Sequence, residues 1–407
     1  MNSETLDPIC EFYTNHPFPP PLENLDRALE LYQDENVRRS EFHLLWPSRE
    51  YREDLEVLVA GCGTWQAAKH ALCHPGSRVV AIDVSKTSLD HTNYLKDKYD
   101  LNNLEVRQLP IENAADLGRE FDHIICTGVL HHLADPDAGL RALRSVLKRD
   151  GAMYLMLYAP YGRAGVYMMQ EYCRRLGVGT SFEEMRDLIS VLKLLPPNHP
   201  VLAAQGGSRE FNGDALADAL LNPRDRSYTV PQLFDFLDGS GLVLGRWYWQ
   251  AAYLPQCGMI ARTPHATRLE QLPERERFAA MELWRGLMAN HSLIAYRNEA
   301  DHDERRIRFD DDEYLRYVPV RMPWTACVTQ NPPPGAAGLV INQTHVFPDL
   351  YLTINVPQKN LYEAIDGQKN IAQIIEAVGE TDPSIPQDFF EKLWQHDQVV
   401  FDTSKAR

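Results

Sequence analysis

Two glycines and an aspartate near the start of the chain have the spacing of a nucleotide-binding turn. The stretch VLVAGCGTWQ, residues 57–66, places Gly61 and Gly63 directly after an apolar run. A glycine turn at the carboxyl end of a strand lets backbone N–H groups approach an anion, and the following helix adds its positive end. Asp83 follows 22 residues after Gly61, at the end of the next apolar run. A carboxylate at that spacing is suited to accept hydrogen bonds from both ribose hydroxyls of a nucleoside.

The alternative for Asp83 is an ordinary surface aspartate beside a helix. We favour the ribose role because the strand, the glycines and the acid occur together.

The residue at position 66 bears on which nucleoside the turn would bind. A dinucleotide fingerprint, G-x-G-x-x-G, needs a third glycine there, and this chain has Gln66. The sequence therefore gives less support to a turn that binds the pyrophosphate of a dinucleotide.

Four stretches resemble the motifs of class I S-adenosylmethionine-dependent methyltransferases. VLVAGCG resembles the first motif, an acidic residue followed by G-x-G-x-G, and VVAIDVS resembles the second, with Asp83 in the ribose position. LPIENA stands where the family contacts adenine. FDHIICTGVLHHLADPDAGLRALRSVLKRDGAMYLMLYAP resembles the region from the fourth strand through the fifth. The resemblance covers about residues 55–160 and extends more loosely to about residue 263.

The resemblance implies S-adenosylmethionine as the cofactor and gives roles to residues after the predicted strands. Ile111 would cover the adenine face, and Glu112 or Asn113 would accept from the adenine amino group. Thr127 and Gly128 would lie next to the sulfonium. An ordinary loop is the alternative for the first three. The implied cofactor-binding set is Gly61, Cys62, Gly63, Asp83, Val84, Ile111, Glu112, Thr127 and Gly128.

Two residues depart from the family's first motif. Val59 stands where the family has an acidic residue, so backbone carbonyls or another side chain would hold the methionine amino group. Trp65 stands at the last glycine, where a positive φ would strain it. We expect Thr64 and Trp65 to belong to the following helix, with the indole beside the loop or forming a wall of the site.

His131 and His132 are the candidates for a general base, because histidine titrates near neutral pH. The alternative is a structural turn, since this doublet recurs in the family. Methyl transfer depends mainly on positioning of the nucleophile, because the methyl group of the cofactor is already activated.

The segment after the fifth predicted strand, YAPYGRAGVYMMQEY, is expected to face the methyl acceptor. The alternative is that its Tyr and Met side chains form the core of a helix. The candidate acceptor-binding residues are Tyr158, Tyr161, Arg163, Tyr167 and Gln170.

Strands alternate with helices between residues 51 and 160, which predicts parallel βαβ units and an α/β, Rossmann-like doubly wound sheet. Residues 135–151 predict a helix that Asp135 caps and Gly151 ends. Residues 229–263 predict a helix and two late strands of the same sheet.

The remaining segments define the domain boundaries. The predicted parts are an N-terminal extension at 1–50, a methyltransferase domain at 51–263 with a helical insert at about 161–225, a helical connector at 264–325, and a smaller C-terminal α+β, winged-helix-like accessory domain at 326–407. The proline-rich extension is either a linker or a lid that carries Phe12, Tyr13 and Phe18.

Composition excludes several classes of protein. A net charge of −16 repels phosphate backbones, so nucleic acid is not expected as a partner. No apolar run approaches the ~18 residues of a membrane helix, and the polar, acidic start is unlike a signal peptide. The seven cysteines include no Cys-x-x-Cys pair, and no cluster has metal-ligand spacing. A reducing cytoplasm and no metal are therefore expected.

The sequence thus predicts transfer of a methyl group to oxygen or nitrogen. A small molecule is suggested by the helical insert, which would close over a compact ligand, and it is the favoured acceptor because nothing in the chain offers a groove for an acidic partner. A protein acceptor is the alternative, since the accessory domain would dock a partner. A catalytically silent methyltransferase-like scaffold and, third, a dehydrogenase stay open. The sequence assigns no oligomeric state.

Overall fold

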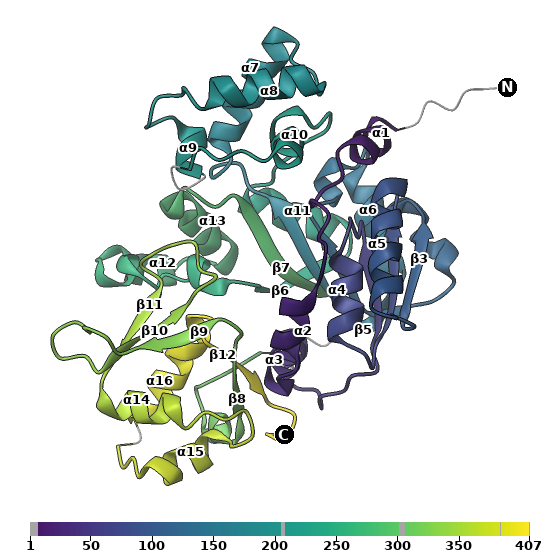
Figure 1. The fold of residues 1–407 in the computed structure, drawn as a ribbon. Helices are drawn as coiled ribbons and strands as arrows, with labels where there is room; N and C mark the ends of the chain where they lie inside the picture. Colours follow the sequence, from purple (N-terminus) through teal and green to yellow (C-terminus); the bar gives the residue numbers. More distant parts are fainter. Residues whose placement is uncertain (1–6, 205–207, 301–305, 383, 407) are drawn as a thin grey trace. The chain divides into compact units, whose positions relative to one another are not determined.

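The computed structural model describes residues 7–204, 208–300, 306–382 and 384–406 (Figure 1). The chain divides into two compact units, each assembled from three stretches. The first unit comprises Met1–Asp26, Glu53–Leu244 and Leu283–Asn298, and the second comprises Arg27–Arg52, Gly245–Glu282 and Glu299–Arg407.

A seven-stranded sheet forms the centre of the first unit, with strand order β3-β2-β1-β4-β5-β7-β6. Its strands are β1 (Glu56–Ala60), β2 (Arg78–Asp83), β3 (Leu104–Gln108), β4 (Phe121–Thr127), β5 (Leu147–Tyr158), β6 (Leu242–Trp247) and β7 (Asn290–Arg297). Strands β1 to β5 pair in parallel, and β7 pairs antiparallel with β5. The strand order reverses between β1 and β4, where open α/β sheets bind their ligands. The Rossmann-like α/β prediction is confirmed.

Strand β1 is covered on both faces. Val57, Leu58 and Val59 are each 0% exposed. Val57 and Val59 pack with Ala67 and Ala71 of the following helix. An uninterrupted apolar strand therefore reflects burial between two layers of helices, as the sequence indicated.

Helices and short 3-10 turns surround this sheet. They are α1 (Pro8–Asn15), α4 (Gln66–Cys73), α5 (Lys86–Lys98), η1 (Ile111–Leu117), η2 (Leu130–His132), α6 (Pro136–Ser145), α7 (Ala164–Leu176), α8 (Phe182–Leu192), α9 (Pro200–Ala204), α10 (Gly213–Leu221) and α11 (Val230–Gly239). Helices α7 to α10 gather into a separate cluster in the view of Figure 1, and they lie within the predicted insert.

Helix α6 is shorter than its sequence pattern suggests. Asp135 caps it, as expected, by accepting a hydrogen bond from the N–H of Ala138. The helix ends at Ser145, and Leu147 already belongs to β5, where it pairs with Phe121. The expected end at Gly151 is wrong because pairing with β4 begins at the fully buried Leu147.

The second unit combines helices with two small antiparallel sheets, ordered β11-β10-β9 and β12-β8. Its strands are β8 (Val318–Arg321), β9 (Thr325–Val328), β10 (Gly338–Asn342), β11 (Tyr351–Ile354) and β12 (Val399–Asp402). Its helices and 3-10 turns are α2 (Asp26–Tyr32), α3 (Glu35–Leu45), η3 (Gln250–Tyr253), η4 (Met259–Arg262), α12 (His265–Glu270), α13 (Glu274–Arg285), η6 (Asp312–Arg316), α14 (Val356–Glu363), α15 (Ile371–Val378) and α16 (Ser384–Gln395). The small sheets are consistent with the predicted α+β character.

The buried carboxylate of Asp397 organises the second unit. It accepts hydrogen bonds from the N–H groups of Gln250 and Ala251, at 3.2 and 3.0 Å, and pairs with Arg246 at 3.0 Å. His345 Nε2 lies 3.3 Å from the same carboxylate. A buried charge with this many partners joins segments far apart in sequence.

The compact units differ from the predicted domain boundaries. Of the two late strands expected within 229–263, only β6 forms there, and the segment after it folds as 3-10 turns. The strand beside β5 comes instead from residues 290–297, which the sequence placed in a connector. The difference arises because β7 runs antiparallel to β5. It is therefore not part of a βαβ unit, the pattern by which the sequence identifies strands of a parallel sheet. None of the described helices is long and apolar enough to span a membrane.

Because α7 and α9 are in close contact, adding one methyl group between them should lower the stability of the protein. A Cβ on Gly165 would lie 2.2 Å from the backbone nitrogen of Val201, so Gly165→Ala should destabilise the protein by about 2 kcal/mol. Gly239→Ala is the matched control, because no atom lies within 4 Å of its added Cβ. Thermal unfolding followed by circular dichroism compares the two. Equal melting temperatures for both variants would contradict the close packing.

Candidate functional site

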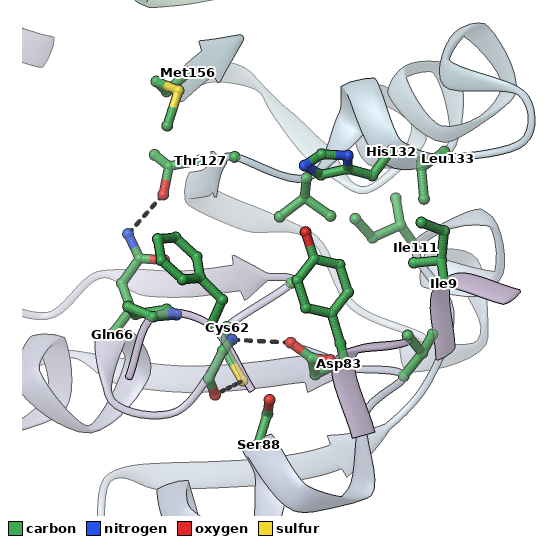
Figure 2. Close-up of a pocket in the computed structure, with 18 of the residues that line it drawn as sticks. Ile9, Cys62, Gln66, Asp83, Ser88, Ile111, Thr127, His132, Leu133 and Met156 are labelled. Atoms are coloured by element: carbon green, nitrogen blue, oxygen red, sulfur yellow. Dashed lines mark hydrogen bonds between the residues drawn. The ribbon is translucent and has the colours of Figure 1, made fainter. Parts of the chain in front are cut away.

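A cavity of about 260 Å³ lies at the carboxyl ends of the parallel strands (Figure 2). It is lined by Ile9, Tyr13, Phe18, Pro19, Gly61, Cys62, Gly63, Trp65, Gln66, Asp83, Val84, Ser88, Leu109, Ile111, Glu112, Thr127, Gly128, Val129, His132, Leu133, Met156 and Tyr158. These residues follow or end β1, β2, β3, β4 and β5, together with α1 and the segment after it. This edge of the sheet is where an α/β fold is expected to bind ligands.

The loop after β1 requires both of its glycines. Gly61 and Gly63 have φ values of 69° and 56°. A Cβ on Gly61 would lie 2.4 Å from a methyl group of Val129, and one on Gly63 would lie 2.9 Å from Cδ of Pro19. Glycine is therefore needed for the backbone conformation and for the close approach of neighbouring segments.

The carboxylate of Asp83 joins the end of β2 to the glycine loop. Its Oδ2 accepts from the N–H of Gly63 at 2.9 Å, and its Oδ1 accepts from the N–H of Ser85 at 2.8 Å. Burial raises the pKa of the Asp83 carboxyl, and these N–H groups oppose the shift. Each carboxylate oxygen keeps a further lone pair for a ligand in the cavity.

Trp65 fits the loop without backbone strain. Its φ is −144°, and α4 begins only at Gln66, so Thr64 and Trp65 precede the helix rather than belong to it. The expectation that they are helical is wrong, because the turn that places Gly63 against Pro19 delays the first helical residue. The indole lines the cavity, in line with the expected wall.

Val59, the other departure from the motif, is a core residue. It is fully buried against α4 and does not line the cavity. No acidic side chain therefore reaches the cavity from this position.

All nine residues predicted to contact the cofactor line the cavity. Figure 2 shows Asp83, Cys62 and Ser88 along one side, and Thr127, Met156 and His132 along the other. Thr127 also accepts a hydrogen bond from Gln66 Nε2 at 2.9 Å, which links the ends of β4 and α4. The more loosely predicted Asn113 does not line the cavity.

The N-terminal segment contributes to the cavity wall. Tyr13, Phe18 and Pro19 are lining residues, and Thr64 Oγ1 donates to the carbonyl oxygen of Pro19 at 2.7 Å. Phe12 instead packs in the core of helices α7 to α10. The segment after α1 is therefore part of the cavity wall, and the choice between a linker and a lid stays a prediction.

The two histidines have different surroundings. His132 lines the cavity, and its Nδ1 lies 2.6 Å from the carbonyl oxygen of Arg224. His131 is 0% exposed, does not line the cavity, and lies with its ring 3.9 Å from that of Tyr158. Burial holds the pKa of His131 well below its usual value, helped by the neighbouring His132 and Arg163. Only His132 is therefore placed to meet a ligand.

Of the five predicted acceptor residues, Tyr158 lines the cavity. The other four lie outside it: Tyr161, Arg163, Tyr167 and Gln170. Tyr161 is exposed. Arg163 pairs with Asp225 at 2.9 Å, and Gln170 Nε2 donates to the same carboxylate at 2.7 Å. The polar face of α7 therefore pairs within the insert rather than pointing into the cavity.

The sequence reasoning did not identify Asp218 of α10. Its carboxylate accepts from the hydroxyl of Tyr13 at 2.7 Å and lies 3.4 Å from that of Tyr158, both lining residues. The signal was an aspartate beside the buried Leu216 and Ala217, where an apolar residue would be expected. In the described part of the chain, no group of three or more His, Cys, Asp or Glu side chains is placed to hold a metal ion.

Comparison with known proteins identifies the domain around this cavity. Residues 58–153 match a family model described as a methyltransferase domain. A ubiquinone biosynthesis O-methyltransferase of Bartonella quintana is 31% identical over 107 residues, which cover 25% of this chain and 41% of that enzyme. An uncharacterised protein of Synechococcus sp., syc1184_c, is 27% identical over 274 residues, 65% of each chain. The chain thus spans less than two thirds of these relatives, so their whole activity does not transfer to it.

The fold is also similar to a solved structure. PKMT2 from Rickettsia typhi superposes with a TM-score of 0.65 at 16% identity, over 91% of this chain and 75% of that one. Its complex with AdoHcy superposes with a TM-score of 0.61. At this identity the similarity establishes the fold. Together with the matched family model, it confirms that the chain contains a class I S-adenosylmethionine-dependent methyltransferase domain, a class whose cofactor is S-adenosylmethionine.

Proposed function

We propose that the cavity binds S-adenosylmethionine and that the protein transfers its methyl group to an oxygen or nitrogen atom of a small molecule. The observation that carries the proposal is the position of Asp83. Its two oxygens are oriented by the N–H groups of Gly63 and Ser85, and the carboxylate lines the cavity at the end of β2. A preorganised carboxylate with spare lone pairs is suited to a pair of ribose hydroxyls.

The rest of the cavity suits the other parts of this cofactor. Ile111 and Val84 offer apolar contact for an adenine ring, and Glu112 offers an acceptor for its amino group. The backbone of Gly61 and Gly63 approaches the cavity without a side chain. The bound cofactor would supply an activated methyl group, and the chain would position the acceptor in line with it.

His132 is suited to remove a proton from the acceptor. Because a carbonyl oxygen only accepts, the 2.6 Å contact with Arg224 requires a proton on Nδ1. Nε2 then carries the lone pair, and it is buried without a hydrogen-bond partner among the described residues. This tautomer is the one that a general base at the cavity needs.

The acceptor is better accounted for by a small molecule than by a polypeptide. Residues of α1 and of the segment after it line part of the cavity wall and would limit the access of a folded polypeptide. A protein acceptor remains the second candidate, and a catalytically silent scaffold is the outcome if no transfer occurs.

Methyl-labelled S-adenosylmethionine tests the proposal directly. The protein is incubated with the label and a cell extract, and the products are separated into protein, nucleic-acid and small-molecule fractions. Label in the small-molecule fraction is expected. Label confined to protein would replace the small-molecule proposal, and absence of label from every fraction would favour the scaffold.

Asp83→Ala should weaken the binding of S-adenosylhomocysteine at least about fivefold, or about 1 kcal/mol, because it removes charge-assisted hydrogen bonds to the ribose. Isothermal titration calorimetry measures the dissociation constant. Asp90→Ala is the matched control, since Asp90 is an exposed residue of α5 that pairs with Lys86. Equal affinities for both folded variants would place the cofactor elsewhere.

His132→Gln should lower the rate of methyl transfer about 100-fold, because the base would be lost, while the affinity for S-adenosylhomocysteine changes less than twofold. The rate of methyl transfer from labelled S-adenosylmethionine is measured between pH 6 and 9 with the extract fraction that takes up the label. An unchanged rate in the folded variant would show that no base acts at this position.

A further inference from the structure

Three polar side chains form a cluster at the end of the cavity beside His132. We call Tyr13, Tyr158 and Asp218 the Asp218 cluster. The carboxylate of Asp218 lies 2.7 Å from the hydroxyl of Tyr13 and 3.4 Å from that of Tyr158. Asn222 Nδ2 donates to the Tyr13 oxygen at 2.9 Å. The two tyrosines line the cavity, and Asp218 lies behind them.

Among the described residues, no Lys, Arg or His side chain pairs with the Asp218 carboxylate. Asp218 is 3% exposed, and its partners in the described part of the chain are the two phenols and the amide of Asn222. Burial, together with Asp218, raises the pKa of both Tyr13 and Tyr158, so both phenols keep their protons and donate them to the carboxylate. A buried carboxylate usually has a positive partner, and here a ligand would supply it.

The arginine that packs on Tyr158 forms its ion pair with another carboxylate. The Arg163 guanidinium lies 3.6 Å from the ring centre of Tyr158 and pairs with the buried Asp225 at 2.9 Å. His131 contacts the same Tyr158 ring at 3.9 Å. Tyr158 is therefore held by its neighbours, with its hydroxyl directed to Asp218.

This end of the cavity offers hydrogen-bond acceptors to a ligand. The phenol protons of Tyr13 and Tyr158 are directed to Asp218, so the Tyr158 oxygen is left to accept, and the Tyr13 oxygen, which already accepts from Asn222, keeps one further lone pair. His132 Nε2 carries a lone pair, because its Nδ1 donates to the backbone. None of the residues that line the described cavity is Lys or Arg. A ligand group with several N–H donors and a positive charge is complementary to this end of the cavity.

We propose that the methyl acceptor is a primary amine, which enters as an ammonium group and is recognised by Tyr158 and Tyr13 in front of the Asp218 charge. The inference rests on the proposed methyl transfer. His132 Nε2 takes one ammonium proton. The freed nitrogen lone pair forms the new N–C bond to the methyl group, and the C–S electron pair passes to sulfur. The products are the methylated ammonium and S-adenosylhomocysteine.

Selective blocking of amines tests the acceptor class. A cell extract is separated into a small-molecule filtrate and a protein fraction, and half of each is treated with acetic anhydride and then hydroxylamine. This treatment leaves amines acetylated and restores hydroxyl groups. With labelled S-adenosylmethionine, acetylation should reduce incorporation at least tenfold in the fraction that holds the acceptor, and that fraction distinguishes a free amine from a polypeptide side chain.

Undiminished label after acetylation would overturn the amine proposal and leave the methyltransferase proposal standing. No label in either untreated fraction would count against methyl transfer itself, and the amine proposal would fall with it.

Variants of the cluster test its role in recognition. Asp218→Asn removes the charge, and Tyr158→Phe removes one oxygen while keeping the ring. Each should raise the acceptor KM at least tenfold and change the affinity for S-adenosylhomocysteine less than twofold. Asp187→Asn, at an exposed position of α8, is the control for a charge change in the insert. An unchanged acceptor KM in folded Tyr158→Phe would overturn recognition by this cluster.

Discussion

The site depends on one constraint, the two hydrogen bonds that the Asp83 carboxylate accepts from the N–H groups of Gly63 and Ser85. One bond fixes the glycine loop after β1, and the other fixes the turn into α5. Together they orient the carboxylate while its remaining lone pairs face the cavity. The two glycines are then required by geometry, because a Cβ at either position would meet Val129 or Pro19. In the proposed function, cofactor binding and local folding thus depend on the same carboxylate.

A second level of organisation comes from the insert and the N-terminal segment. Helix α10 brings Asp218 behind the cavity, and α1 brings Tyr13 to its wall. Helix α7 packs so closely on the segment around Val201 that only glycine fits at position 165. Tyr13, Tyr158 and Asp218 therefore all lie outside the matched residues 58–153, in parts of the chain that can differ between enzymes of one fold.

The meeting of the glycine loop and the end of β2 at one cavity could be predicted from the sequence because the signals are local. Gly61, Gly63 and Asp83 lie at strand ends whose apolar runs are easy to recognise, and parallel pairing brings those ends together. The residues at the His132 end of the cavity could not be predicted in the same way. Tyr161 and Gln170 sit on the segment expected to face the acceptor, yet they point elsewhere, while Asp218 comes from sixty residues further along than Tyr158. The periodicity of apolar residues shows which faces of a helix are buried. When several helices pack together, it does not show which of those faces borders a cavity. The antiparallel β7 was misplaced for a similar reason, since its pairing with β5 is set by tertiary contact.

A crystal structure of the protein with S-adenosylhomocysteine tests the central claim most directly. The account predicts both ribose hydroxyls on the Asp83 carboxylate, the adenine against Ile111, and the sulfur on the side of the cavity that holds Thr127 and His132. A nucleoside bound with its ribose away from Asp83, or at another place on the chain, would contradict it.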